Sequence, residues 1–297
     1  MCYSVRISIN ESYFRGRPNL PMRPRTESLK IIRDGGFDTI DFSMHSMTHA
    51  DDDTCHEKWI HGYRDYCDKI GLSVNQAHAP FFEGRPMPDG FVPRLLECVD
   101  DCAILGADCL VVHADTWYEK DYVQWDYKKV VDTIYDVYAP VVDRAEKRGV
   151  KIAMETLFEW IGNNDHRVRF CSYVEEVDEI VSRFGCDTVG VCLDFGHTYM
   201  AYGNDICDAI GRLNSKIIAT HTHDNTRHRD SHNLPYMGYI NWDHVLNALA
   251  RKGYEGDLTF EVNYGCLPDE FAVDFAKYAH TIGESMVSRF LEYKKLL

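Results

Sequence analysis

Short apolar segments alternate eight times with longer segments of helical period along this chain of 297 residues. The apolar segments are rich in Val and Ile without strict polar–apolar alternation, which is typical of strands buried on both faces of a parallel sheet. The strands predicted in this way are Tyr3–Ile9, Phe37–Phe42, Ser73–His78, Asp108–His113, Lys151–Glu155, Thr188–Asp194, Lys216–His223 and Asp257–Val262.

Segments with helical periodicity follow each of these strands. The predicted helices are Glu27–Asp34, Glu57–Ile70, Phe91–Leu105, Tyr127–Arg148, Tyr173–Phe184, Asp205–Leu213, Trp242–Lys252 and Phe271–Tyr293. Eight strand–helix units in a chain of this length predict an α/β fold, a single (β/α)8 TIM barrel that forms one domain over residues 1–297. An open doubly wound sheet would need a glycine-rich phosphate loop after its first strand, where this sequence reads ISINESYF.

The composition indicates which partners are disfavoured and in which cellular compartment the protein is expected. The chain has 32 Lys and Arg against 47 Asp and Glu, so its formal net charge is −15, which disfavours nucleic acid and anionic membranes as partners. No apolar run approaches the ~18 residues of a membrane helix, and the start, MCYSVRISIN, lacks a signal-peptide pattern. Eleven cysteines without any CxxC motif are typical of free thiols. We therefore expect a cytoplasmic protein.

Side chains of the kind that bind metals stand at the ends of six consecutive predicted strands. They are His78, His113, Glu155, Asp194 with His197 shortly after it, His221 with His223, and Glu261. In a parallel barrel these strand ends open onto one face. Burying so many hydrated groups together is costly unless a divalent cation pairs them, so the pattern predicts a metal site. His221 and His223 share one face of a strand, which leaves open whether both reach the metal.

Seven short motifs around these residues are similar to those of one known family. They are HAPF, VVHAD, METL, LDFGH, HTHDN, DSHNLP followed by GYINW, and TFEVN. In this order and spacing the chain resembles the xylose isomerase-like TIM barrels. That family includes sugar-phosphate isomerases and epimerases as well as family-2 apurinic/apyrimidinic (AP) endonucleases.

The resemblance to the sugar-acting members implies one divalent cation, with Mn, Mg, Co or Zn as the candidates. Its ligands by motif would be Glu155, Asp194, His223 and Glu261. The two glutamates would also be the catalytic acid and base, while His197 and Arg229 match substrate-binding positions. The implied activity is isomerisation or epimerisation of a small carbohydrate, through an enediolate that the metal stabilises.

The resemblance to the nuclease members implies an alternative activity. Those members hold three zinc ions, and the further metal ligands that they need have counterparts here in His78, His113, His197, Asp230 and His232. The alternative function is therefore a zinc-dependent, AP endonuclease-type phosphodiesterase. A dehydratase or lyase that acts through the same enediolate is a third hypothesis on this scaffold.

Two further groups of residues lie in the loops that follow the predicted strands. Arginines there indicate either an anionic substrate or ordinary solvated loop charge: Arg15, Arg17, Arg23, Arg25, Arg167, Arg169, Arg227 and Arg229. Aromatic residues there are interpreted equally as a surface for sugar rings or as packing at the rim or at a homo-oligomer interface. They are Phe14, Phe81, Trp117, Trp125, Phe158, Trp160 and Tyr199.

Overall fold

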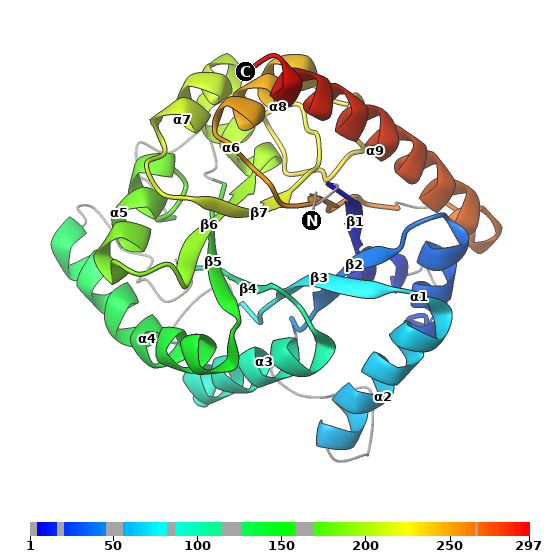
Figure 1. The fold of residues 1–297 in the computed structure, drawn as a ribbon, viewed down its shortest axis with the longest axis horizontal. Helices are drawn as coiled ribbons and strands as arrows, with labels where there is room; N and C mark the ends of the chain where they lie inside the picture. Colours follow the sequence, from blue (N-terminus) through cyan, green and yellow to red (C-terminus); the bar gives the residue numbers. More distant parts are fainter. Residues whose placement is uncertain are drawn as a thin grey trace.

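A ring of parallel strands surrounded by helices forms the protein (Figure 1). The computed structural model describes residues 5–16, 21–45, 56–81, 87–114, 126–158, 169–264 and 267–297. Within them the strands are β1 (Ile7–Asn10), β2 (Thr39–Ser43), β3 (Ser73–His78), β4 (Cys109–Val112), β5 (Lys151–Glu155), β6 (Val189–Asp194), β7 (Ile217–His221) and β8 (Leu258–Phe260). All pair in parallel, in the order β7-β6-β5-β4-β3-β2-β1-β8, so the expected TIM barrel is confirmed.

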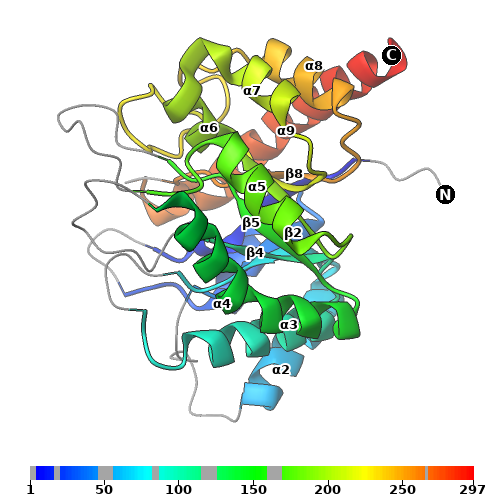
Figure 2. The same ribbon diagram turned by 90° about the vertical axis from the view of Figure 1, so that its left-hand side faces the viewer.

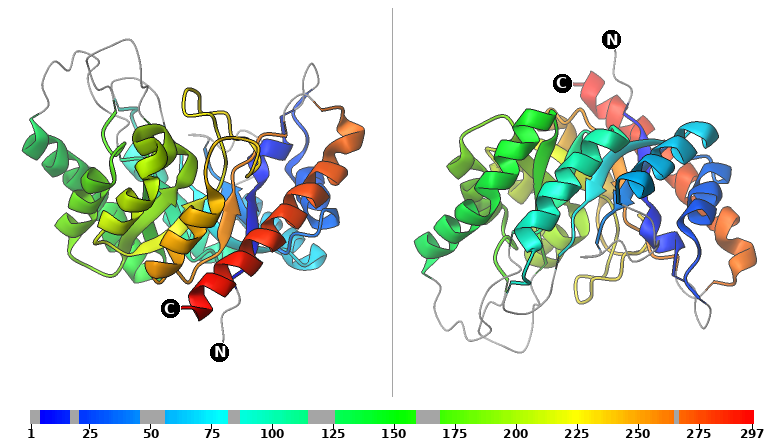
Figure 3. Two further views of the ribbon diagram at one scale, coloured as in Figure 1. Left: turned by 90° about the horizontal axis from the view of Figure 1, so that it is seen from above. Right: turned by 90° about the horizontal axis from the view of Figure 1, so that it is seen from below.

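The helices cover the outside of this barrel. They are α1 (Arg25–Asp34), α2 (His56–Ile70), α3 (Phe91–Leu105), α4 (Tyr127–Arg148), α5 (Val174–Phe184), α6 (Phe195–Tyr202), α7 (Ile206–Arg212), α8 (Trp242–Arg251) and α9 (Ala272–Lys295), with 3-10 turns η1 (Glu11–Phe14), η2 (Gly203–Asp205) and η3 (Asp269–Phe271). Their apolar faces pack on the strands to form the main core. The last helix, α9, runs along both α1 and α8 (Figure 3).

Helix α6 is absent from the sequence-based prediction, which placed no helix between Asp194 and Asp205. The helix begins directly where β6 ends, because the Asp194 side chain accepts a 2.7 Å hydrogen bond from the backbone N–H of His197. A carboxylate in this position caps the free N–H groups at the start of a helix. The cap fixes His197 on the first turn of α6, immediately above the barrel.

The barrel closes through a single bridge rather than through a regular ladder between the described strands β7 and β8. Thr222, just beyond β7, pairs with Phe260 of β8. Its backbone N–H donates to the Thr259 carbonyl at 2.7 Å, and its own carbonyl accepts from the Glu261 N–H at 3.3 Å. This seam therefore brings the end of β7 beside Glu261.

Different segments of the chain lie at the two ends of the barrel. The loop after β7, drawn in yellow, lies at one end, and α9 runs to the C-terminus at the other (Figure 2). Inside the barrel, small side chains of β4 to β7 form a separate apolar cluster: Cys109, Val111, Ala153, Cys192 and Ala219. Along the described part of the chain, no helix combines the length and the apolarity needed to cross a membrane.

Candidate metal centre

Three buried carboxylates surround one ring nitrogen of His221, the last residue of β7. Nδ1 of His221 lies 3.3 Å from Glu155, 3.8 Å from Asp194 and 3.5 Å from Glu261. His221 and Asp194 have no exposed surface, and the two glutamates are almost completely buried. We call this group, Glu155, Asp194, His221 and Glu261, the central position.

The predicted ligand set contains His223 in place of His221, and the structure brings that set together only in part. Nε2 of His223 lies 3.0 Å from Asp194, but the described contacts of His223 include neither Glu155 nor Glu261. His223 stands beyond the end of β7, so its ring turns toward the loop that follows. There its ring stacks on His232, with ring centroids 4.1 Å apart.

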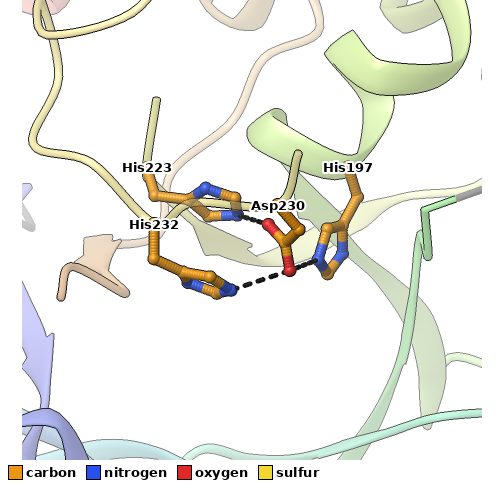
Figure 4. A group of neighbouring side chains, drawn as sticks. All are labelled: His197, His223, Asp230 and His232. Carbon is orange, nitrogen blue, oxygen red and sulfur yellow. Dashed lines mark hydrogen bonds and ion pairs between the residues drawn. The ribbon is translucent and has the colours of Figure 1, made fainter. Parts of the chain in front are cut away.

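A second group forms around the carboxylate of Asp230, which lies between three imidazole rings (Figure 4). Asp230 is 3.0 Å from His232, 3.4 Å from His197 and 3.8 Å from His223. One ligand atom from each of these four residues lies within 4.8 Å of all the others. We call this group the loop position, because Asp230 and His232 come from the loop between β7 and α8.

The backbone of His232 is unusual, which supports a functional role for it. Its φ of 47° lies in the left-handed region, which residues other than glycine seldom adopt. Nδ1 of His232 donates to the Glu261 carbonyl at 2.9 Å, which leaves Nε2 facing Asp230. The loop therefore holds this ring in one orientation despite the cost to the backbone.

A third group joins the ends of β3, β4 and β5. His78 and His113 approach the same oxygen of Glu155, at 3.1 Å and 3.0 Å. Nδ1 of His78 donates to the Ala79 carbonyl at 2.9 Å, so Nε2 is the nitrogen left for Glu155. One ligand atom from each of these three residues also lies within 4.8 Å of the other two. Glu155 thus belongs both to this group and to the central position.

The charges of these groups depend on one another. Burial alone would raise the pKa of Glu155, but the neighbouring histidines, His221 foremost, hold it well below its ordinary value. Burial lowers the pKa of His113 to about 4. Although burial opposes it, Asp230 raises the pKa of His232 to about 9. Glu155 thus remains ionised, and Asp230 stabilises the protonated form of His232.

The donor set fits a divalent cation. Nδ1 of His221, Nδ1 of His223 and Oδ1 of Asp230 are buried without a hydrogen-bond partner among the described residues. Unpartnered buried polar atoms are rare in folded proteins and call for an explanation. Imidazole nitrogens and carboxylate oxygens together suit Mn, Co or Zn, and a carboxylate-rich set also suits Mg.

A small cavity opens above these groups, with a volume of about 190 Å³. Both Glu155 and Glu261 line it, whereas Asp194 is not among the described residues that line it. The other described residues that line it are Tyr13, His45, His78, Phe81, His113, Phe158, Arg169, His197, Asp230 and His232. Tyr13 and His45 were not identified from the sequence, because neither belongs to a recognisable motif.

The predicted arginines and aromatic residues lie in different surroundings in the structure. Arg169, which stacks over Phe158 at 4.5 Å, lines the cavity together with Phe81. Arg23 and Arg25 are buried and pair with acidic residues of the chain. Arg229, which was predicted to contact the substrate, is exposed and does not line the cavity. Phe14 and Tyr199 are buried in the core. Arg17, Trp117, Trp125, Trp160 and Arg167 lie outside the described residues.

Comparison with known proteins places the chain in a family. The model of the xylose isomerase-like TIM barrels matches residues 29–278. The chain belongs to this family. This confirms the resemblance that the motifs indicated.

Relatives in sequence are similar to this chain over part of their length. An uncharacterised protein, y4fM, of Sinorhizobium fredii is 30% identical over 170 residues, which are 57% of this chain and 52% of that protein. An inosose isomerase of Halalkalibacterium halodurans is 30% identical over 151 residues, 48% of this chain and 51% of that protein. The chain thus spans about half the length of these curated relatives.

Solved structures share the fold along almost the whole chain. A D-tagatose 3-epimerase-like protein has a TM-score of 0.74 at 20% identity and covers 98% of both chains. The IOLI protein with a bound zinc atom has a TM-score of 0.74 at 21% identity, covering 96% of this chain and 99% of its own. A family-2 AP endonuclease from Brucella melitensis has a TM-score of 0.67 at 19% identity, covering 92% and 99%. At these identities the similarity concerns the fold.

Proposed function

We propose that this protein is a metal-dependent isomerase or epimerase of a small carbohydrate. One observation carries the proposal: Glu155 and Glu261 both line the cavity, and both lie against the same nitrogen of His221. Two carboxylates that face one small cavity can remove a proton from a substrate carbon and return it. Such a transfer inverts the carbon or moves the carbonyl group.

In this proposal the central position holds the cation through Glu155, Asp194, His221 and Glu261. A divalent cation bound there would polarise a substrate carbonyl and make the neighbouring C–H bond more acidic. Glu155 and Glu261 exchange the proton, and Asp194 serves as a ligand only, because it does not line the cavity. His197, whose pKa is raised well above its ordinary value by Asp194 and Asp230 against the effect of burial, stands ready to donate to a substrate oxygen.

The names of the relatives support a small hydroxylated carbonyl compound as the substrate. They include an inosose isomerase and a D-tagatose 3-epimerase-like protein. A cavity of about 190 Å³ is smaller than the pockets that bind drug-sized ligands. Phe81 and Phe158 add apolar surface to it, which suits the C–H face of a sugar.

Deuterium exchange tests this proposal directly. Metal-loaded protein is incubated in D₂O with a panel of ketoses and inososes, and deuterium at carbon is measured by mass spectrometry. We expect exchange into at least one compound, lost after removal of the metal by a chelator. Absence of exchange with every compound, in protein shown to contain metal, would contradict the proposal.

The three adjacent groups of ligands favour a second candidate function. Glu155 is shared by two groups, and Asp194 contacts both the central position and His223 of the loop position. A cluster of three zinc ions in such an arrangement can activate water for phosphodiester cleavage, and one structural neighbour is described as a family-2 AP endonuclease. The net charge of −15 weakens this candidate, because DNA affinity depends on cationic contacts to phosphate. Cleavage of abasic DNA without carbon-bound deuterium would favour it.

A further inference from the structure

Asp41, a buried residue of β2, lies on the opposite side of His221 from the central position. Its Oδ2 is 3.5 Å from Nε2 of His221, while Nδ1 of the same ring faces the three carboxylates. Neither Asp41 nor His221 has exposed surface. The imidazole ring therefore lies between a carboxylate cluster on one side and a single carboxylate on the other.

Neighbouring strands hold the Asp41 carboxylate in place. Asn10 of β1 and Gln76 of β3 are its partners in the strand register. Their side-chain amides donate to the same oxygen of Asp41, at 3.2 Å and 3.3 Å. The Asn10 amide also donates to Glu261 at 3.1 Å. One layer of the barrel thus connects Asp41 to a residue of the central position.

The partners of Asp41 explain its orientation but not its charge. Neutral amides would hold an uncharged side chain of the same shape equally well, and burying a carboxylate without a cationic partner is costly. Among the described contacts of Asp41, no Lys or Arg appears. The described group that gains most from a negative charge at this place is the N–H of the His221 ring.

We propose that Asp41 is a positioning residue for the metal, acting through His221. It keeps the proton on Nε2 and fixes the ring, so that Nδ1 presents its lone pair to the cation of the central position. The second nitrogen of a ligand histidine generally needs such a partner, which orients the ring and makes it a stronger ligand. This inference rests on the proposed function, because it assumes that His221 binds the cation.

Substitution of Asp41 by Asn tests the inference, since it retains the shape and removes the charge. We expect the affinity of the metal-free protein for Co²⁺ to fall by about 10- to 100-fold, measured by chelator competition. The visible absorption of the bound Co²⁺ should change as well, because the geometry and basicity of its imidazole ligand change. A purely structural role would alter unfolding without altering that spectrum.

Asp101→Asn is a matched control. It also removes a buried carboxylate from a histidine, His56, at 2.7 Å, but this pair joins α2 and α3 outside the site. We expect no change in Co²⁺ affinity or spectrum. If Asp41→Asn does not fold, Gln76→Met keeps the carboxylate but removes one of its donors, and a several-fold weaker affinity is expected.

The possible results separate this inference from the proposed function. If Asp41→Asn and Gln76→Met both bind Co²⁺ as the wild type does, while His221→Ala weakens binding, Asp41 is not a positioning residue and the central position stands. If His221→Ala also binds Co²⁺ like the wild type, the central position itself is wrong. A loss of affinity in Asp101→Asn equal to that in Asp41→Asn would show a general effect of removing buried charge, and would overturn the inference.

Discussion

The indole Nε1 of Trp242 donates a 2.8 Å hydrogen bond to Oδ2 of Asp224, a carboxylate with no exposed surface. The same oxygen accepts a hydrogen bond from the backbone N–H of Tyr236 at 3.0 Å. The other oxygen accepts from the N–H groups of Asn225 and Ile240, at 2.9 Å and 3.2 Å. The loop between β7 and α8 is therefore folded around one buried carboxylate, and this loop supplies Asp230 and His232 to the loop position.

Trp242→Phe should impair the loop position and leave the central position intact. The change replaces the indole by a smaller aromatic ring and removes one hydrogen bond to a charged group, which together cost about 2 kcal/mol or more. We expect a loss of unfolding free energy of that size in urea and less bound metal per chain, with deuterium exchange retained. Full metal content in a destabilised Trp242→Phe protein would mean that Asp230 and His232 do not depend on this support.

His221→Ala and His223→Ala should differ in their effects on activity. His221 lies against all three carboxylates of the central position, whereas His223 contacts Asp194 and the loop position. We expect His221→Ala to abolish carbon-bound deuterium exchange and His223→Ala to retain it. The opposite result would favour the ligand set implied by the motifs, in which His223 completes the central position.

Glu155→Gln and Glu261→Gln should each abolish turnover while the protein stays folded. Removal of a general acid or base typically costs 10²- to 10⁴-fold in rate, and loss of a ligand charge adds to this. Activity is measured by exchange and folding by circular dichroism. Glu175→Gln is a matched control on the surface helix α5, where Glu175 pairs with Arg212. Full activity of Glu261→Gln would refute its role as acid or base.

The stability of the metal-free protein should depend on the protonation of His232. Its pKa is raised from 6.5 to about 9, chiefly by Asp230 and against the effect of burial. A raised pKa in the folded state stabilises the protein fully below pH 6.5, and this contribution is lost as the pH rises through about 9. Urea unfolding of chelator-treated protein should show this decline, and Asp230→Asn should flatten it. An equally steep decline in Asp230→Asn would assign it to another group.

Much of the barrel could be predicted because its period repeats. Buried parallel strands are continuous apolar runs, and the helices between them carry a clear apolar face, so all eight units were recognised. Strand ends were less certain: β7 was predicted to reach His223 but ends at His221. Helix α6 was missed because it follows β6 without any intervening turn residues.

The candidate site was predictable in composition but not in pairing. The order of the motifs pointed to nine residues, and in the structure these belong to overlapping clusters of candidate ligands that also include His221. Sequence spacing cannot show which of two histidines on the same side of a strand faces the carboxylates. That depends on where β7 ends and on the turn that follows it. Asp41, His45 and Tyr13 belong to no motif, since their positions are set by contacts between strands distant in sequence.

The seam at Thr222 also bears on which ions the protein accepts. His221 ends β7 and Glu261 follows β8. Among the described residues, an isolated bridge and two hydrogen bonds of the Thr220 hydroxyl join these strands, so the separation of His221 and Glu261 is not fixed by a continuous ladder. A coordination shell that spans such a junction can widen or contract by small shifts of one strand end. We therefore expect the protein to work with ions of unequal radius, with manganese and cobalt exchanging for one another at modest cost in rate.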